Sequence, residues 1–343
     1  MAPRVDLVLD PARGERIPIE LPLTLTVPLD AARRELELPD FVDLSDPIVA
    51  KAVALLAAAR RADPPVRFAV FGGTAHRLQC PASNDRALGL RHELHDLDVA
   101  VLLKEARAFQ RFLAGLAARE GSQLTFFETS GDRIFNSLSG GARLREHMVV
   151  EHHGTEVVLG TLDLVADEFR FCHRFDVRTD VTRAAREGGT LAPVHLFLAK
   201  AQFVRRIPQA DADRVADRVL EPFGRHELVI GPEAKDVRDL LALLHDHDVG
   251  EGPGAISATA IARLLGADWG FWKTVSLNVD LLARSSILAG LPAGPRERIA
   301  GRVARLKALL ASLRPKRRFG LFGGPWWQEV DSVPATDATV GVS

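Results

Sequence analysis

The sequence predicts an α+β protein in which a mixed sheet comes first and a helical domain follows. Up to about residue 190, short apolar runs of strand character alternate with helical patterns. From Pro193 onward the apolar residues recur at helical spacing over long stretches, with almost no strand signal. This change of pattern predicts two domains that differ in secondary structure.

The first part of the chain is expected to contain an N-terminal extension and then alternating helices and strands. Residues 16–29 alternate apolar and polar positions but include three prolines, which favours edge strands or an extended arm over 1–45. Apolar residues at helical spacing predict helices over 47–61 and 105–121, the second ending at Gly121. Apolar runs of strand character predict strands at 66–71, 97–103, 123–128, 147–151 and 156–165. The sheet domain is therefore predicted over 46–190.

The second part is predicted to be a helical domain over 191–315. Its helical patterns cover 193–206, 209–220, 233–246, 257–266, 269–288 and 294–314. The chain from 316 to 343 is basic, then glycine-rich, then polar, which is typical of a flexible tail. Trp326 and Trp327 are expected to dock this tail on the body of the protein.

Composition excludes several classes of protein. The 343 residues are 47% hydrophobic and 26% charged, which is typical of a globular protein with a sizeable core. A formal net charge of −1 argues against a protein that coats nucleic acid, because that task requires a surplus of Lys and Arg. Cys80 and Cys172 are the two cysteines, too few for a disulfide framework, and favour a reducing cytoplasm. No apolar run approaches the roughly 18 residues of a membrane span, so no membrane partner is expected.

A glycine pair follows the strand predicted at 66–71. Gly72 and Gly73, followed by Thr74, stand where this strand passes into a helix. Backbone N–H groups at such a helix start attract anions, and glycine lets a triphosphate approach closely. A tight strand-to-helix turn without a ligand is the commoner explanation of a lone glycine pair, so the pair alone decides little.

Three acidic residues occur where the sequence predicts strands. Asp96 and Asp98 alternate on one strand, so their side chains share one face, where they repel unless solvated or bridged by a divalent cation. Asp163 lies inside an apolar strand, where an unpaired carboxylate would be costly. Asp167 follows that apolar run and is expected in a turn. If the two strands are neighbours, three carboxylates meet opposite the glycine turn and could hold two metal ions.

The order of these motifs resembles the DNA polymerase β-like nucleotidyltransferase superfamily, in which a glycine pair, a helix, an Asp-x-Asp strand and a later strand carboxylate follow one another. The segments "TLDLVADEFRFCHRFDVR", "LFLAKAQFV", "AKDVRDLLALLHDHDVGE" and "DWGFWKTVSLNVDLL" are similar to those of AbiEii/AbiGii-toxin-type nucleotidyltransferases. The resemblance covers about residues 60–285. One departure is a longer gap between Gly73 and Asp96, which leaves Arg77 or Arg91 as the basic residue ahead of the acid pair.

The resemblance implies a mixed-sheet nucleotidyltransferase core and a set of site residues. Asp96, Asp98 and Asp163 would bind Mg²⁺ or Mn²⁺, and Asp163 would help to deprotonate the acceptor hydroxyl. The residues expected to bind a nucleoside triphosphate such as ATP are Gly72, Gly73, Thr74, Arg77 and Lys200, with Asp236 and Asp239 orienting Lys200 or the nucleotide. For Lys200 the alternative is a structural, ion-paired lysine.

Two functions follow from these expectations. The first is a nucleotidyltransferase of toxin or defence type that moves a nucleoside monophosphate to a hydroxyl of RNA such as tRNA, of a protein or of a small molecule. A cognate antitoxin would then be a partner. The second is a catalytically silent module of the same fold that binds a nucleotide or a protein partner.

Overall fold

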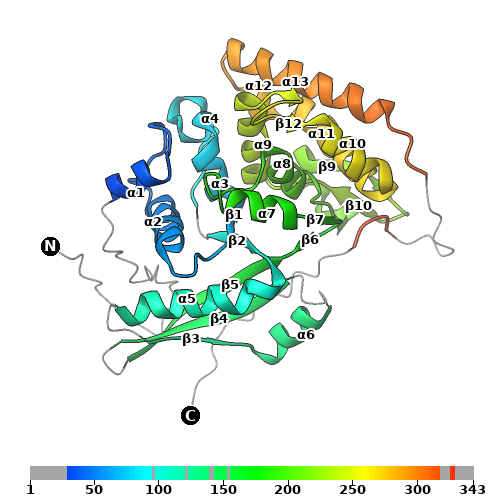
Figure 1. The fold of residues 1–343 in the computed structure, drawn as a ribbon. Coiled ribbons are helices and arrows are strands. Elements are labelled where there is room, and N and C mark those ends of the chain that lie inside the picture. The colour runs from blue at the N-terminus through cyan, green and yellow to red at the C-terminus, as the bar shows by residue number, and fades with distance from the viewer. Residues whose placement is uncertain are drawn as a thin grey trace.

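A computed structural model describes residues 29–94, 97–119, 123–138, 143–152, 155–316 and 325–328 of the chain. It shows a mixed α+β fold, which confirms the predicted class. A five-stranded sheet with helices beside it forms one part, and a mainly helical part packs above it in the view of Figure 1.

The first part contains most of the elements that the sequence predicts before residue 190. Its helices are α1 (Leu29–Glu35), α2 (Pro47–Arg61), α3 (Gly72–Gln79), α4 (Pro81–Asn84), α5 (Ala106–Arg119), α6 (Ser130–Leu138) and α7 (Arg178–Ala184), with short 3₁₀ turns at Arg86–Leu88 and Leu103–Glu105. Its strands are β1 (Ala69–Phe71), β2 (Asp98–Val101), β3 (Gln123–Phe127), β4 (Arg143–His152), β5 (Thr155–Ala166), β6 (Glu168–Arg170) and β7 (Arg174–Asp176). The expected arm over 16–29 lies almost wholly outside the described residues. Within 1–45 the helix α1 stands where an extended segment was predicted, so that prediction is wrong for residues 29–35.

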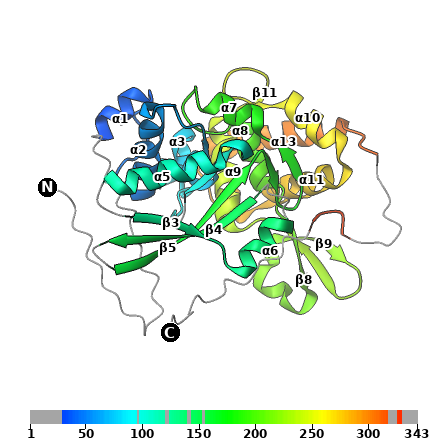
Figure 2. The ribbon, with the colours of Figure 1, turned by 60° about the horizontal axis from the view of Figure 1, so that its bottom comes forward.

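The central sheet has the strand order β1-β2-β5-β4-β3. β1 and β2 are antiparallel, with Phe71 opposite Asp98, and β2 and β5 are parallel, with Val99 opposite Leu164. β1 precedes the glycine pair, and β2 and β5 carry the predicted acids Asp98 and Asp163. These three strands are neighbours in the sheet, as expected. β4 and β5 form a long antiparallel hairpin that extends beyond β1 and β2, and α5 runs beside it (Figures 1 and 2).

The outer side of β1 is bonded to a segment far along the chain. Val70 N donates to Gly189 O at 2.8 Å, and Leu191 N donates to Val70 O at 3.1 Å. These bonds form an isolated parallel bridge between Val70 and Thr190. Helix α8 (Pro193–Ala201) begins directly afterwards. The bridge therefore fixes the start of α8 against the strand that leads into the glycine pair.

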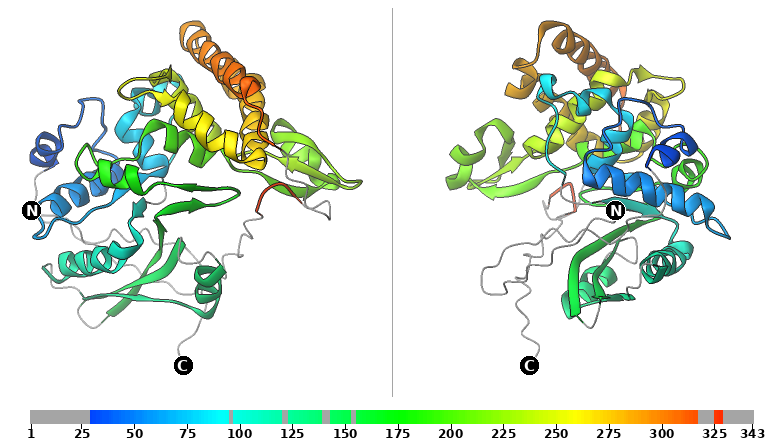
Figure 3. Two further views of the ribbon diagram at one scale, coloured as in Figure 1. Left: turned by 45° about the vertical axis from the view of Figure 1, so that its right-hand side comes forward. Right: turned by 90° about the vertical axis from the view of Figure 1, so that its left-hand side faces the viewer.

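The second part is helical except for two small sheets. Its further helices are α9 (Ala234–Asp246), α10 (Ala258–Ala267), α11 (Trp269–Arg284), α12 (Ser286–Ala289) and α13 (Ala293–Ser312), and its strands are β8 (Arg205–Pro208), β9 (Val219–Phe223), β10 (Glu227–Ile230), β11 (Val249–Gly250) and β12 (Ile256–Ser257). β8, β10 and β9 form a three-stranded antiparallel sheet. This sheet projects from the helices in Figures 2 and 3.

The three-stranded sheet corrects the prediction of continuous helices after residue 193. The helix predicted over 193–206 ends at Ala201, and the one predicted over 209–220 is a 3₁₀ segment kinked at Val215 that leads into β9. Strands of four or five residues are too short to show a clear period. The alternating acids and alanines of 209–218 imitate an amphipathic helix, although no side chain there is buried.

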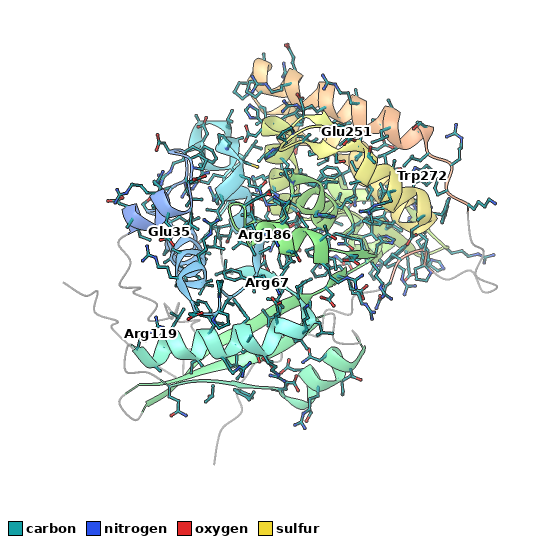
Figure 4. The ribbon with its side chains drawn as sticks, in the orientation of Figure 1. Glu35, Arg67, Arg119, Arg186, Glu251 and Trp272 are labelled. Atoms are coloured by element: carbon teal, nitrogen blue, oxygen red, sulfur yellow. The ribbon has the colours of Figure 1, made fainter. Side chains whose placement is uncertain are left out.

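One hydrophobic core joins the two parts. A continuous cluster of buried side chains runs from Val99 in the sheet through Phe109 on α5 and Leu196 on α8 to Leu306 on α13. Each fully buried side chain of this size contributes about 1.5–3 kcal/mol. Trp272, labelled on α11 in Figure 4, adds a hydrogen bond from its Nε1 to Leu310 O on α13 at 2.9 Å. No helix in the described part of the chain is both long and apolar enough to cross a membrane.

Candidate functional site

A pocket of about 420 Å³ lies where the sheet meets α8, α9 and the three-stranded sheet. Its walls come from segments far apart in the sequence, which the shared core brings together. The lining residues are Phe71, Gly72, Gly73, His92, Glu93, Leu94, Asp98, Val165, Phe171, Cys172, Leu196, Ala199, Lys200, Phe203, Val204, Arg205, Arg218, Gly231, Pro232, Glu233, Lys235 and Asp236.

The glycine pair forms one wall of this pocket at the start of α3. Gly72 has a φ of +63°, and a Cβ atom there would lie 1.8 Å from Asp98 Oδ2. A Cβ atom on Gly73 would lie 2.7 Å from the side chain of Leu94. The first helical turn has no side-chain cap among the described residues. The left-handed backbone and the Asp98 carboxylate favour glycine at Gly72, whereas a side chain at Gly73 would have to displace the end of the Leu94 side chain. The helix start faces a space that suits an anion.

The structure describes only some of the acidic residues that the sequence predicts for the site. Asp98 begins β2 and lines the pocket. Asp163 directly precedes Leu164 and Asp98 directly precedes Val99, so the parallel register brings the two backbone positions level on neighbouring strands. Asp96 lies outside the described residues. Among the side chains that the structure describes, no three His, Cys, Asp or Glu residues are grouped to hold a metal ion. Asp167 is in a turn as expected, where its Oδ1 accepts from Leu103 N at 3.0 Å.

Lys200 on α8 faces the pocket and is held by two carboxylates of α9. Its Nζ lies 2.7 Å from Asp236 Oδ1 and 3.3 Å from Asp239 Oδ2. Asp236 also accepts from the backbone N–H of Glu233 at 3.2 Å, as part of the cap of α9. Burial would lower the pKa of Lys200, but Asp239 and Asp236, with a contribution from Asp98, raise it well above its ordinary value. The ammonium is thus a fixed positive charge close to Asp98.

His92 completes this charged cluster, and the sequence analysis did not single it out. Its Nε2 lies 2.7 Å from Asp239 Oδ1, and its Nδ1 lies 2.9 Å from Glu93 O. Both partners are acceptors, so the ring donates at both nitrogens and carries a positive charge. Burial opposes this charge, but Asp239 outweighs it and raises the pKa of His92.

His76 lies behind the cluster on α3. Its Nδ1 is 2.6 Å from Gly72 O, while its buried Nε2 has no hydrogen-bond partner among the described residues. Burial lowers the pKa of His76, and the charge of Asp239 opposes this shift.

Arg77, Arg91 and Thr74 do not line the pocket. The guanidinium of Arg77 is buried and donates to the backbone carbonyls of Ser83 and His92. Arg91 pairs with Asp43 at 2.7 Å. Thr74 is buried within α3. Both arginines border a second pocket of about 410 Å³ on the other side of His92. Among the residues that the structure describes, His92 is the basic side chain that faces the first pocket ahead of the acid pair, and it stands four residues before Asp96 in the sequence.

The far end of the pocket combines an apolar wall with a basic rim. The rings of Phe171 and Phe203 contact each other with centroids 5.3 Å apart. The rim is formed by Arg205, Lys235 and Arg218, the last of which donates to Gly231 O at 2.9 Å. An apolar surface beside several cations fits a ligand with a flat apolar group and several negative charges.

In comparisons with known proteins, no family model, no curated protein and no solved structure matches the chain. The site is therefore interpreted from its own geometry.

Proposed function

We propose that the protein is a metal-dependent nucleotidyltransferase that moves a nucleoside monophosphate from a nucleoside triphosphate to a hydroxyl acceptor. One observation carries the proposal: Gly72 packs directly on Asp98 in a pocket that the side chain of Lys200 also lines. An anion-binding helix start, a carboxylate and a buried cation around one space are the groups that a metal-bound triphosphate requires. The level backbone positions of Asp98 and Asp163 add support.

The donor set at this wall fits a hard divalent cation. Asp98 presents carboxylate oxygens, which Mg²⁺ and Mn²⁺ prefer, and the missing side chain of Gly72 makes room for this carboxylate at the wall of the pocket. Asp96, Asp98 and Asp163 would hold the metal. When bound, the metal would neutralise charge on the reacting phosphate oxygens.

The remaining residues would bind and orient the nucleotide. The Gly72–Gly73 turn would receive phosphate oxygens, while Lys200, held by Asp236 and Asp239, would supply a positive charge that does not move. The acceptor oxygen would attack the α-phosphorus as the bond to pyrophosphate breaks, and Asp163 would take the acceptor proton. The acceptor is an RNA such as tRNA, a protein or a small molecule, and an antitoxin would be the regulatory partner.

One observation favours the second candidate, a silent module that binds a nucleotide or a protein partner. The ammonium of Lys200 already contacts two carboxylates, so part of its charge is neutralised within the protein. Lys200→Ala separates the two functions. In the enzyme it should weaken triphosphate binding far more than nucleoside binding, because an ammonium recognises phosphate charge and not the base. Equal losses for ATP, AMP and adenosine would favour the silent module.

The proposed activity is tested with Asp98→Asn and a matched control, Asp167→Asn. Asp98→Asn should abolish transfer of labelled nucleotide to total RNA, cell extract or small hydroxylated compounds, and should weaken Mg²⁺-dependent triphosphate binding in calorimetry. Asp167→Asn should leave both unchanged, because Asn tolerates the φ of +63° and can still accept from Leu103 N. Full Mg²⁺-nucleotide affinity in Asp98→Asn would contradict the proposal.

A further inference from the structure

The short segment 325–328 near the C-terminus is docked on the helical part beside the three-stranded sheet (dark red in Figure 3). Trp326 Nε1 lies 3.1 Å from Thr274 Oγ1 on α11, and Lys273 Nζ lies 3.6 Å from the centroid of the Trp326 ring. A Cβ atom on Gly270 would lie 2.2 Å from Trp326 O, so the backbone of the segment lies directly on α11. Trp326 thus anchors the segment to this helix.

Trp327 makes the contact that reaches the pocket. Its side chain is buried, at 5% exposed, in a small cluster with Cys172, Val204 and Val229. Gln328 N donates to Cys172 O at 2.9 Å, and Cys172 Sγ lies 3.2 Å from Val204 O. Cys172 and Val204 themselves line the pocket. Trp327 therefore lies directly behind the apolar wall of the site.

Only the size and shape of the Trp327 ring matter for this packing. Its indole Nε1 is buried and has no hydrogen-bond partner among the described residues. The ring also meets Phe223 on β9, with centroids 5.6 Å apart. A phenylalanine could fill most of the same space, whereas alanine would leave a cavity behind Cys172.

We infer that residues 325–328 are a positioning segment of the pocket, in which Trp327 holds Cys172 and Val204 in place to form the wall that receives the nucleobase. This inference rests on the proposed function for the identity of the ligand. The packing itself does not depend on that function. The segment acts through the wall and does not touch the nucleotide.

The test uses full-length protein with Cys80→Ser, so that Cys172 is the one thiol left. Trp327→Ala should raise the rate of Cys172 alkylation by N-ethylmaleimide about tenfold or more, because a buried thiol reacts only when its cover opens. It should also weaken binding of Mg²⁺-nucleoside triphosphates about tenfold while leaving inorganic tripolyphosphate, which has no base, unchanged. Trp327→Phe should restore both properties.

Trp272→Ala is the matched control. It removes another partly buried tryptophan of the helical part, whose Nε1 bonds to Leu310 O and which does not line the pocket. It should lower the melting temperature without changing Cys172 alkylation or nucleotide affinity. If Trp327→Ala does not fold, Gln328→Pro, which removes the N–H that bonds Cys172 O and also restricts the backbone of Trp327, should raise alkylation in the same direction.

The outcomes separate the inference from the proposed function. Unchanged alkylation in Trp327→Ala, an equal rise in Trp272→Ala, or equal losses of nucleotide and tripolyphosphate binding would overturn the inference. A wild-type protein that binds no triphosphate would overturn the proposed function and the assignment of a nucleobase to the wall. In that case the alkylation rates alone decide whether Trp327 holds the wall in place.

Discussion

At the scale of single residues, the contact between Gly72 and Asp98 shows why the glycine is needed. The backbone at Gly72 is left-handed, with φ of +63°, and the space that a side chain would occupy is filled by the Asp98 carboxylate. The left-handed backbone and the contact with Asp98 each disfavour any residue other than glycine, but only the contact with Asp98 involves a residue of the pocket. A comparison with Gly89, which is left-handed at φ of +67° but has no atom within 4 Å of the Cβ position, separates the two.

Gly72→Ala is therefore expected to differ from Gly89→Ala. Both should lose about 1–2 kcal/mol of stability through the left-handed backbone. Gly72→Ala must also displace the carboxylate of Asp98, and so should weaken Mg²⁺-triphosphate binding about tenfold or more. Calorimetry on both variants, with urea unfolding, measures the two effects separately. Equal nucleotide affinities would show that the Gly72–Asp98 contact has no role in binding.

His92 is a second single residue with a testable effect, because its ionisation should make the stability of the protein depend on pH. Burial would lower its pKa, but the hydrogen bond to Asp239 and the charge of Asp239 raise it above the ordinary value of 6.5. The contribution of protonated His92 to the free energy of unfolding is then complete below pH 6.5 and is lost as the pH rises through the raised pKa.

The free energy of unfolding should therefore be larger for wild type than for His92→Gln, and this difference should be greatest below pH 6.5. The difference should shrink as the pH rises above 6.5. Urea unfolding of both proteins across this range measures the difference. A difference that grows with pH would show that the ring is neutral in the folded protein.

At the scale of elements, the cluster around Asp239 ties α8, α9 and the loop before β2 together. Asp239 is 1% exposed and lies against Lys200 and His92. Burial would raise its pKa, yet His76, Lys200 and His92 around it hold the pKa well below the ordinary value. Without the charge of Asp239, the cations of Lys200 and His92 lose a shared carboxylate partner.

Asp239→Asn should therefore cost about 3–5 kcal/mol of stability, the range found when one partner of a buried ion pair is removed. The matched control is Asp280→Asn, which breaks the 2.7 Å pair with Lys307, whose two side chains are half exposed. That variant should lose at most about 1 kcal/mol. Urea unfolding measures both. Similar losses would mean that the buried cluster is no stronger than a surface pair.

The sequence predicted the elements with long or strongly marked patterns and missed those without them. The glycine pair, the strand at Asp98 and the helices at 47–61 and 294–314 have clear turn or periodic signals. His92 was missed because it lies in an irregular loop with no period, and its role depends on a contact with Asp239 on a distant helix. Strands β8 to β10 were missed because they are short. The metal-binding roles of Asp96, Asp98 and Asp163 stay predictions.

At the scale of the whole molecule, the shared core means that the two parts are expected to unfold together. All four tryptophans, Trp269, Trp272, Trp326 and Trp327, lie in the second half of the chain, while Cys80 is buried between α3 and α4. Fluorescence therefore reports on the helical part, and thiol exposure reports on the place where α3 and α4 pack on α9, since Cys80 Sγ lies 3.6 Å from His247 Nε2.

In a Cys172→Ser protein, the urea transitions followed by tryptophan fluorescence and by exposure of the Cys80 thiol should coincide. The reason is that residues of α3 and α8 belong to the same buried cluster, so neither part can lose its packing alone. A fluorescence transition that precedes thiol exposure would show that the surroundings of the tryptophans lose their packing before α3 and α4 separate from α9.

The bridge between Val70 and Thr190 also bears on how the chain avoids association with copies of itself. A terminal strand offers its backbone groups to any other extended chain, which is a common start of aggregation. On β1 the segment around Thr190 already bonds to both the N–H and the C=O of Val70. The pairing at Val70 would therefore hinder the addition of a strand from another molecule at the β1 edge of the sheet.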